Sequence, residues 1–409
     1  MEYTFNAYYT LIAAVVVLML GRALVQKINF LQRYNIPEPV AGGLVAAIVA
    51  FMCYHFFGAS GKFSSELQTS FMLIFFASIG LSANFKKLME GGKGLIIFLV
   101  GISLFIVVQN MVGIGLATAL DLNPLIGLVA GSITLTGGHG TAAAWGSTLE
   151  TRYGVDGATT LGMASATFGL VIGGLMGGPI ARMLIERKRL ATPIANNNAN
   201  NSDQPFGDDG SAAFEYRNKT RLITADNAIT TLGLFAACLA FAHLMTGLVK
   251  GTPFELPTFV WALFGGVVLR NVLEGIFKVS MFDRAIDVFG NASLSLFLAM
   301  ALLSLKLWQL AGLAGPLMII LAVQTVVMGL FAVFVTFKIM GSNYDAAVLS
   351  AGHCGFGMGA TPTAVANMQS ITNTYGASHK AFLIVPLVGA FFVDLVNVVV
   401  IQTLLKIFG

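Results

Sequence analysis

Two stretches of glycine, threonine and other small residues interrupt apolar segments of this chain, at 134–145 (TLTGGHGTAAAW) and 352–363 (GHCGFGMGATPT). Glycine and threonine are unfavourable inside a continuous helix, so each stretch predicts a break in one. In a membrane, irregular backbone is tolerated only where protein or a water-filled cavity satisfies its polar groups. We therefore interpret the stretches as the tips of two re-entrant hairpins, and such a pair of breaks indicates a transport site.

The predicted tips offer groups that can bind ions and small polar molecules. A helix that ends near the middle of a bilayer leaves N–H or C=O groups unpaired, and these attract carboxylates and cations respectively. Threonine hydroxyls can serve either kind of ligand. The alternative is that small residues only allow helices to pack closely, but two stretches in matching places favour binding. The predicted substrate-binding residues are Thr134, Thr136, Gly137, Gly138, His139, Gly140, Thr141, Gly355, Gly357, Gly359, Thr361 and Thr363.

Asp394 is the only acidic residue near the centre of a predicted membrane span. A carboxylate there is costly unless it is paired, which makes it a candidate for function. It could bind a cation such as sodium, transfer a proton, or form a structural pair with a buried donor. Other polar side chains in apolar segments could bind the same ion or form hydrogen bonds between helices. The predicted sodium ligands are Asp394, Asn397, Asn110, Gln109 and Gln324.

Patterns typical of catalysis and metal binding are missing from the sequence. His139 and His353 have no second His, Cys or acid at metal-ligand spacing, which favours hydrogen-bonded neutral imidazoles over a zinc site. The three cysteines, Cys53, Cys238 and Cys354, lie in apolar surroundings and predict neither disulfides nor a metal centre. No nucleophile elbow or phosphate-binding loop is present. We expect no catalytic activity and no cofactor, with sodium only as a transported ion.

The composition is that of a membrane protein. Of the 409 residues, 56% are apolar and only 10% are charged, a balance that soluble domains do not show. Apolar spans of roughly 20 residues recur along the whole chain. We predict ten spans, near 8–25, 37–57, 66–83, 94–120, 159–185, 228–249, 257–277, 288–305, 313–339 and 381–407. The fold class is therefore an all-α integral membrane protein, with 124–148 and 345–367 as hairpins that do not cross.

The distribution of Lys and Arg predicts the orientation in the membrane. If neither hairpin crosses and both termini lie outside, most cations fall on the cytoplasmic side, as the positive-inside rule requires. These cations are Lys27, Arg33, Lys86, Lys87, Lys93, Arg187, Lys188, Arg189, Arg217, Lys219, Arg221, Lys278, Arg284 and Lys380. A polar segment at 186–225 is then a flexible cytoplasmic linker.

The linker separates two halves, 1–185 and 226–409, that repeat one another. Residues about 220 positions apart match in type; for example, Asn123 matches Asn343 and Gly169 matches Gly389. Each half has five predicted crossings, an odd number, so the halves must be inverted relative to one another in the membrane.

The sequence closely resembles the bacterial glutamate:sodium symporter family. The resemblance covers essentially the whole chain and is weakest in the linker. The resemblance is carried by long runs at 36–43, 131–141, 166–171, 291–301 and 351–368. It implies two inverted five-helix repeats with re-entrant loops, a homodimer, and sodium-coupled uptake of L-glutamate across the bacterial inner membrane. The outside, where both termini are expected, is then the periplasm. The resemblance also implies alternating access by an elevator-type movement.

Three other functions remain open at this point. The chain could carry another anion, such as a di- or hydroxycarboxylate, coupled to sodium or protons. It could be an intramembrane hydrolase that uses His139 or His353, although catalysis does not need two mirror-related halves. It could also be a channel, which saturable uptake would argue against.

Overall fold

The computed structural model describes residues 2–33, 36–58, 60–85, 92–193, 223–252, 256–279, 281–304 and 313–409. Most of the predicted linker, at 194–222, lies outside these residues, as do several of the predicted cytoplasmic cations. Two short strands, β1 (Glu2–Thr4) and β2 (Ser60–Lys62), pair in parallel with Glu2 opposite Ser60. The other regular elements of the described residues are helices.

The described helices lie on both sides of the segment at 194–222. The first half contains α1 (Ala7–Lys27), α2 (Asn29–Arg33), α3 (Glu38–Phe57), α4 (Glu66–Ser82), α6 (Gly92–Ala119), α7 (Pro124–Leu128), the π-helical turn η1 (Val129–Ile133), α8 (Gly138–Tyr153) and α9 (Ala158–Arg187). The second half contains α11 (Ala225–Leu248), α12 (Thr258–Gly275), α13 (Asp283–Leu303), α14 (Ala314–Phe331), η3 (Ala332–Thr336), α15 (Phe337–Ile339), α16 (Tyr344–Gly357), α17 (Thr361–Tyr375), α18 (His379–Leu387), η4 (Val388–Phe392) and α19 (Val393–Phe408).

Seven of the described helices are long and apolar enough to cross a membrane. They are α1, α3, α6, α9, α11, α13 and the continuous run of α14, η3 and α15. The structure is therefore that of a helical membrane protein, as the composition predicts. The other three predicted spans are also helical, as α4, α12 and the run from α18 to α19, but they are not among these seven.

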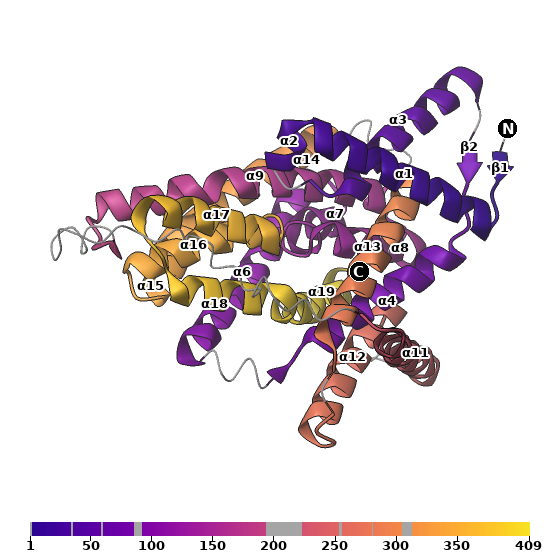
Figure 1. Cartoon of the computed structure of the whole chain (residues 1–409). Coiled ribbons are helices and arrows are strands. Elements are labelled where there is room, and N and C mark those ends of the chain that lie inside the picture. Colours follow the sequence, from indigo (N-terminus) through magenta and orange to yellow (C-terminus); the bar gives the residue numbers. More distant parts are fainter. Residues whose placement is uncertain are drawn as a thin grey trace.

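The helices pack as two bundles (Figure 1). In the peripheral bundle, α4 packs against α12 and α13, α3 packs against α1 and α13, and α11 packs against α12. In the hairpin bundle, α9 packs against α8, α16 and α17, while α6 packs against α7 and α14. Figure 1 shows α11, α12, α13 and α4 on the right and α15 to α18 on the left. Trp145 of α8 and Phe259 of α12 meet edge to face between the bundles, with ring centroids 5.2 Å apart.

Each predicted hairpin is a pair of helices joined by a short break. The first consists of α7 with η1, a break at 134–137, and α8; the second consists of α16, a break at 358–360, and α17. Both are longer than the predicted 124–148 and 345–367, because α8 and α17 continue to Tyr153 and Tyr375 through polar, partly exposed residues. Apolar periodicity does not detect such an end.

Glycine shapes the two hairpins in different ways. Gly138 has a φ of +68°, a left-handed conformation that turns the chain into α8. Gly355 lies where α16 crosses α17, and a Cβ atom there would be 2.4 Å from the Cα of Ala364. One glycine therefore forms the turn at a tip, and the other allows the two arms to touch.

Candidate functional site

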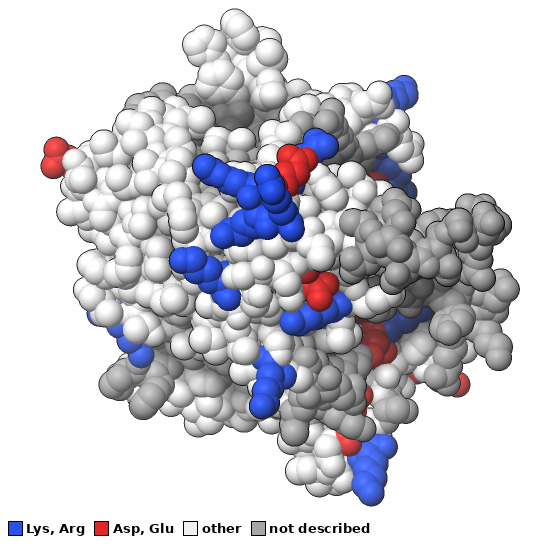
Figure 2. Space-filling view, turned by 90° about the vertical axis from the view of Figure 1, so that its left-hand side faces the viewer, with Lys and Arg blue, Asp and Glu red and all other residues white. Residues whose placement is uncertain are grey.

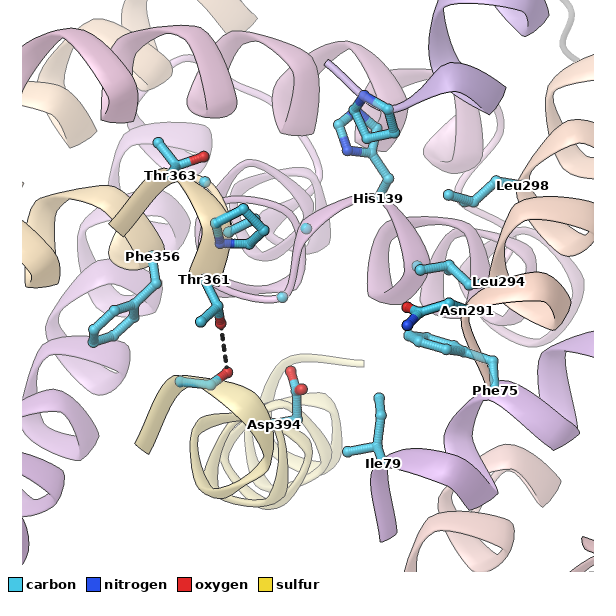
Figure 3. A pocket seen from close by; sticks show the side chains of 18 of the residues that line it. Phe75, Ile79, His139, Asn291, Leu294, Leu298, Phe356, Thr361, Thr363 and Asp394 are labelled. Atoms are coloured by element: carbon cyan, nitrogen blue, oxygen red, sulfur yellow. Dashed lines mark hydrogen bonds between the residues drawn. The ribbon is translucent and has the colours of Figure 1, made fainter. Parts of the chain in front are cut away.

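A cavity of about 670 Å³ lies between the two bundles. Its walls come from both hairpin tips, from α4 and α13 of the peripheral bundle, and from η4 and the start of α19 (Figure 3). The segment that leads into α3, at 37–39, lines it as well. Its volume is typical of sites that bind small molecules.

Both hairpin tips present the N-terminus of a helix to this cavity. Helix α8 begins at Gly138 and α17 begins at Thr361, and neither has a side-chain cap. N–H groups in the first turn of a helix lack partners within it and carry partial positive charge. Residues 137–140 and 359–363 line the cavity, so the first turns of both helices border it. The cavity thus has two places that attract a carboxylate.

The threonines of the second tip add hydroxyl groups to its first turn. The Thr361 hydroxyl donates a hydrogen bond of 2.9 Å to the Gly389 carbonyl of η4. The Thr363 hydroxyl is buried and has no hydrogen-bond partner among the described residues. A buried hydroxyl without a partner is costly, and a ligand in the cavity could supply one.

Gln109 of α6 connects the two tips. Its amide donates a hydrogen bond of 3.0 Å to the Gly357 carbonyl in the second hairpin. Its carbonyl accepts one of 2.7 Å from the Thr136 hydroxyl in the first. Gln324 of α14 in turn donates to the backbone carbonyl of Gln109 at 2.7 Å. All of these side chains are buried.

A second set of bonds satisfies the broken backbone of the first hairpin. Ser132 lies in η1, next to Gly131, whose dihedral angles are not helical. Asn110 donates to the Ser132 hydroxyl at 2.8 Å and accepts from the Ser132 N–H at 2.9 Å. Asn397 of α19 donates to the Ser132 carbonyl at 2.9 Å. These bonds pair groups that the break would otherwise leave unsatisfied.

We call the four residues Gln109, Asn110, Gln324 and Asn397 the amide cluster. Two of its carbonyl oxygens, Gln324 Oε1 and Asn397 Oδ1, are buried without a hydrogen-bond donor among the described residues. Neither side chain is more than 1% exposed. Unpaired oxygens in such a place are rare in proteins, and carbonyl oxygens are ligands that hard cations prefer.

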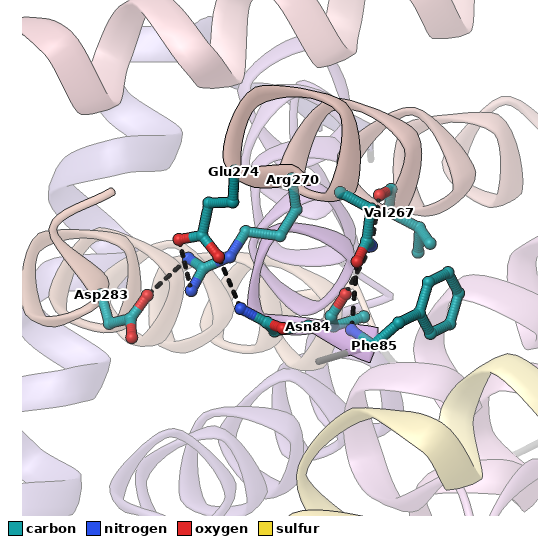
Figure 4. A network of polar contacts seen from close by, with 8 residues as sticks. Asn84, Phe85, Val267, Arg270, Glu274 and Asp283 are labelled. Atoms are coloured by element: carbon teal, nitrogen blue, oxygen red, sulfur yellow. Dashed lines mark hydrogen bonds and ion pairs between the residues drawn. The ribbon is translucent and has the colours of Figure 1, made fainter. Parts of the chain in front are cut away.

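Four carboxylates line the cavity, and two of them have cationic partners. Glu38 is 3.2 Å from Arg22, and Asp283 is 2.5 Å from Arg270. Arg270 is buried and also contacts Glu274 at 3.0 Å, in the network of Figure 4. Asp287 takes part in an interaction as well. Asp394 lines the cavity without a hydrogen bond or ion pair to any described residue.

The structure divides the predicted site residues into two sets. Those that line the cavity are Thr136, Gly137, Gly138, His139, Gly140, Gly359, Thr361, Thr363 and Asp394. Those that do not line it are Thr134, Thr141, Gly355, Gly357 and the amide cluster. Thr134 donates its hydroxyl to the Val129 carbonyl at 2.7 Å, so it has a local structural role. Gly355 provides the crossing of α16 and α17.

Four polar residues of α13 line the cavity but were not predicted as site residues. Asp283, Asp287, Asn291 and Ser295 recur every fourth position, so they form one stripe along a helix. This spacing in an otherwise apolar span is a signal in the sequence. The prediction from sequence did not include these residues, because it was drawn from helix breaks and from acids at the centres of spans, and Asp283 and Asp287 precede the predicted span at 288–305.

The two histidines of the glycine-rich stretches are hydrogen-bonded, as predicted. His139 Nε2 is 3.0 Å from the Thr167 hydroxyl, and His353 Nδ1 is 2.8 Å from the Thr336 hydroxyl. Among the described residues there is no group of three His, Cys, Asp or Glu side chains that could hold a metal ion.

Comparison with known proteins shows the family of this chain. A model of the sodium/glutamate symporter family matches residues 3–377. The chain is 50% identical over 402 residues to the sodium/glutamate symporter of Haemophilus influenzae, covering 98% of each protein. It is 52% identical over 398 residues to the sodium/glutamate symporter of Escherichia coli, covering 97% of each. The chain therefore belongs to the sodium/glutamate symporter family, which is a family of transporters and not of enzymes.

Proposed function

We propose that this protein couples the inward flow of sodium to the uptake of L-glutamate. The observation that carries the proposal is the meeting of two uncapped helix N-termini at one cavity, with the amide cluster behind them. The names of the relatives from Haemophilus influenzae and Escherichia coli agree with it.

The substrate would bind across the two tips. L-Glutamate has two carboxylates, and the first turns of α8 and α17 offer one place for each. The Thr361 and Thr363 hydroxyls would add donors at the second tip. The same arrangement would suit other dicarboxylates, so the amino group of the substrate needs a recognition site of its own.

Sodium would bind at the amide cluster. Sodium is a hard cation that prefers oxygen ligands, and Gln324 and Asn397 supply two buried carbonyl oxygens without donors. Gln109 contacts both tips, so an ion there would draw together the two parts of the substrate site. This arrangement would make substrate binding depend on sodium, as coupling requires.

The membrane voltage sets a minimum for the number of sodium ions. Glutamate carries one net negative charge, and its entry against an inside-negative potential costs about 2.3 kcal/mol per 100 mV. One sodium ion only cancels that cost. Accumulation that uses the voltage therefore requires at least two sodium ions per glutamate, and uptake without net charge movement would disprove this.

The substrate would reach both sides of the membrane by movement of the hairpin bundle past the peripheral bundle, as in an elevator. The main cavity includes Ser82 at the end of α4 and Asp283 at the start of α13. A smaller cavity of about 340 Å³ includes Ser65 at the start of α4 and Ser304 after the end of α13. The two cavities thus lie at opposite ends of the same two helices, which suits alternate access from either side.

This movement can be tested by thiol labelling. Ser82→Cys and Ser304→Cys would each be placed in a chain whose exposed Cys53 is replaced by Ala. The rate of labelling by a membrane-impermeant thiol reagent is measured with and without sodium and glutamate. We expect the two ligands together to raise the labelling rate at one position and to lower it at the other. Equal or unchanged labelling would contradict the movement.

The two halves would be inverted repeats in the membrane. Asn123 and Asn343, which match in sequence, both cap the first helix of their hairpin with a side-chain oxygen. The orientation would place cations on the cytoplasmic side. Figure 2 shows Lys and Arg on the face that contains the end of α9 and the start of α18, where Arg187, Lys188 and Lys380 are exposed. Both termini would lie in the periplasm, and 186–225 would be a cytoplasmic linker.

The assembly would be a homodimer in the bacterial inner membrane, as the resemblance of the sequence implies. Helices α1 and α3 carry many exposed large apolar side chains, among them Ile12, Met19, Ile48 and Met52, so they would face lipid or a second copy. The mass of the purified protein in detergent, corrected for bound detergent, would distinguish a dimer from a monomer.

The first experiment is uptake of labelled L-glutamate by liposomes that contain the purified protein. We expect uptake to exceed equilibrium with an inward sodium gradient and not with an equal choline gradient. Folded protein that takes up no glutamate under either gradient would disprove the proposal. Competition by unlabelled di- and hydroxycarboxylates would then identify another anion.

A further inference from the structure

The cavity must bind both the carboxylates and the ammonium group of an amino acid substrate. No Lys or Arg is among the described residues that line it, so the partial positive charges of the two helix N-termini are left to bind the carboxylates of a substrate. The substrate's ammonium group needs an anionic acceptor at the same place. Of the four lining acids, only Asp394 makes no hydrogen bond or ion pair within the described part of the chain.

Asp394 lies beside the N-terminus of α17. Gly389, five residues before it, accepts the hydrogen bond from Thr361, the first residue of that helix. The π-helical turn η4 ends at Phe392, so Asp394 is in the first turn of α19. Figure 3 shows its carboxylate directed into the cavity, below Thr361 and across from Ile79. A carboxylate held at the start of α17 would therefore bring the adjacent carbon of the substrate toward Asp394.

We propose that Asp394 binds the α-ammonium group of the substrate and selects an amino dicarboxylate over a dicarboxylate without an amine. This assignment rests on the proposed function, and it replaces sodium binding as the role of Asp394. A charge-assisted hydrogen bond between ammonium and carboxylate stabilises the correct substrate. A dicarboxylate without the amine leaves Asp394 unpaired and brings its own two negative charges close to it. Repulsion between these carboxylates and Asp394 then weakens the binding of that ligand.

Sodium is a poorer ligand for this position. Sodium requires several oxygen ligands at one place, and the Asp394 carboxylate has no hydrogen-bonded partner among the described residues, while the Thr361 hydroxyl is bonded to Gly389. The unpaired buried oxygens belong to Gln324 and Asn397, neither of which lines the cavity. The structure thus separates a carboxylate that faces the substrate from neutral oxygens that suit the ion.

The test compares binding of L-glutamate and glutarate, which differ only by the amine. Both are titrated calorimetrically into the purified full-length protein at fixed, saturating sodium. We expect Asp394→Asn to weaken L-glutamate binding by about 30-fold or more, because the charge pair is lost. Glutarate should bind the variant at least as tightly as it binds the wild type, so the preference for the amine collapses.

A control removes the same charge from another wall of the cavity. Glu38→Gln lowers the negative charge equally, but Glu38 already has Arg22 as its partner. We expect the ratio of the two affinities to stay within about threefold, the usual range of a screened charge. If Glu38→Gln changed the ratio of affinities as much as Asp394→Asn does, the net charge of the cavity would explain both changes. The assignment of Asp394 to the ammonium group would then be overturned.

Other outcomes would overturn the assignment alone or together with the function. If Asp394→Asn weakened both ligands by the same factor, Asp394 would act on sodium or on the carboxylates. If the variant did not fold, the test would use the wild-type protein. N-acetyl-L-glutamate, whose amine is blocked, should bind the wild type no more tightly than glutarate does. Binding equal to that of L-glutamate would overturn the proposal. Wild-type protein that binds no L-glutamate at all would overturn the proposed function itself.

Discussion

Gln109 is the side chain through which the two hairpin tips are held together, and its replacement by leucine tests that arrangement. It donates to Gly357 in one hairpin and accepts from Thr136 in the other, at 3.0 and 2.7 Å. Leucine has a similar size but removes both bonds. The tips would then be free to separate, and the substrate site would lose its shape.

The magnitude follows from the groups left behind. Each buried polar group without a partner costs about 1–3 kcal/mol. Thr136 recovers part of this, because its hydroxyl is also 3.4 Å from the Gly357 carbonyl. We therefore expect a loss of about 2–3 kcal/mol, which corresponds to an affinity weaker by about 30- to 150-fold when binding needs both tips in place.

The assay is sodium-dependent uptake of L-glutamate by liposomes, with half-saturating concentrations measured for each ligand. Ser103→Ala is a matched control in the same helix, since the Ser103 hydroxyl bonds only to Leu99 within α6. We expect it to shift neither value by more than about threefold. Wild-type values for both ligands in folded Gln109→Leu protein would refute the conclusion that this residue joins the tips.

Three further substitutions test other parts of the structure. Gly355→Ala should lower the free energy of unfolding by about 3 kcal/mol, because its Cβ would lie 2.4 Å from the Cα of Ala364; thermal unfolding in detergent measures this. Asn397→Leu should raise the sodium concentration for half-maximal uptake by about tenfold, because it removes a buried unpaired oxygen; a sodium titration at saturating glutamate measures this. Arg270→Leu should destabilise the protein by about 1–3 kcal/mol, less than for a fully buried pair because Asp283 is 45% exposed; thermal unfolding again measures it.

Each of these substitutions has a control. Gly233→Ala in α11 meets nothing within 4 Å and should be neutral or slightly stabilising. Thr403→Val on α19 removes only a bond within the helix and should leave the sodium titration unchanged. Arg22→Leu breaks a pair whose members are 64% and 39% exposed, so it should cost less than about 1 kcal/mol. If a control lowered stability or shifted the sodium titration as much as its variant, burial and contact would not explain the effect of that variant.

Composition and the placement of glycine were enough to predict the class of protein and the places where its helices break. The apolar composition and the length of the spans require a helical membrane protein, because a bilayer tolerates few other structures. The glycines at 134–145 and 352–363 located both hairpin tips, since a break depends on the local choice of residues. The polar ends of α8 and α17 were underestimated because they lack the apolar pattern.

Which of the predicted residues face the cavity depends on how the helices pack in three dimensions. Thr134 and Thr136 are two positions apart, yet Thr134 bonds to its own hairpin and Thr136 lines the cavity. Gln109 and Asp394 are both polar residues in apolar spans, but Gln109 is buried between the tips and Asp394 faces the cavity. These differences arise from contacts between helices far apart in the chain, and no local pattern encodes them.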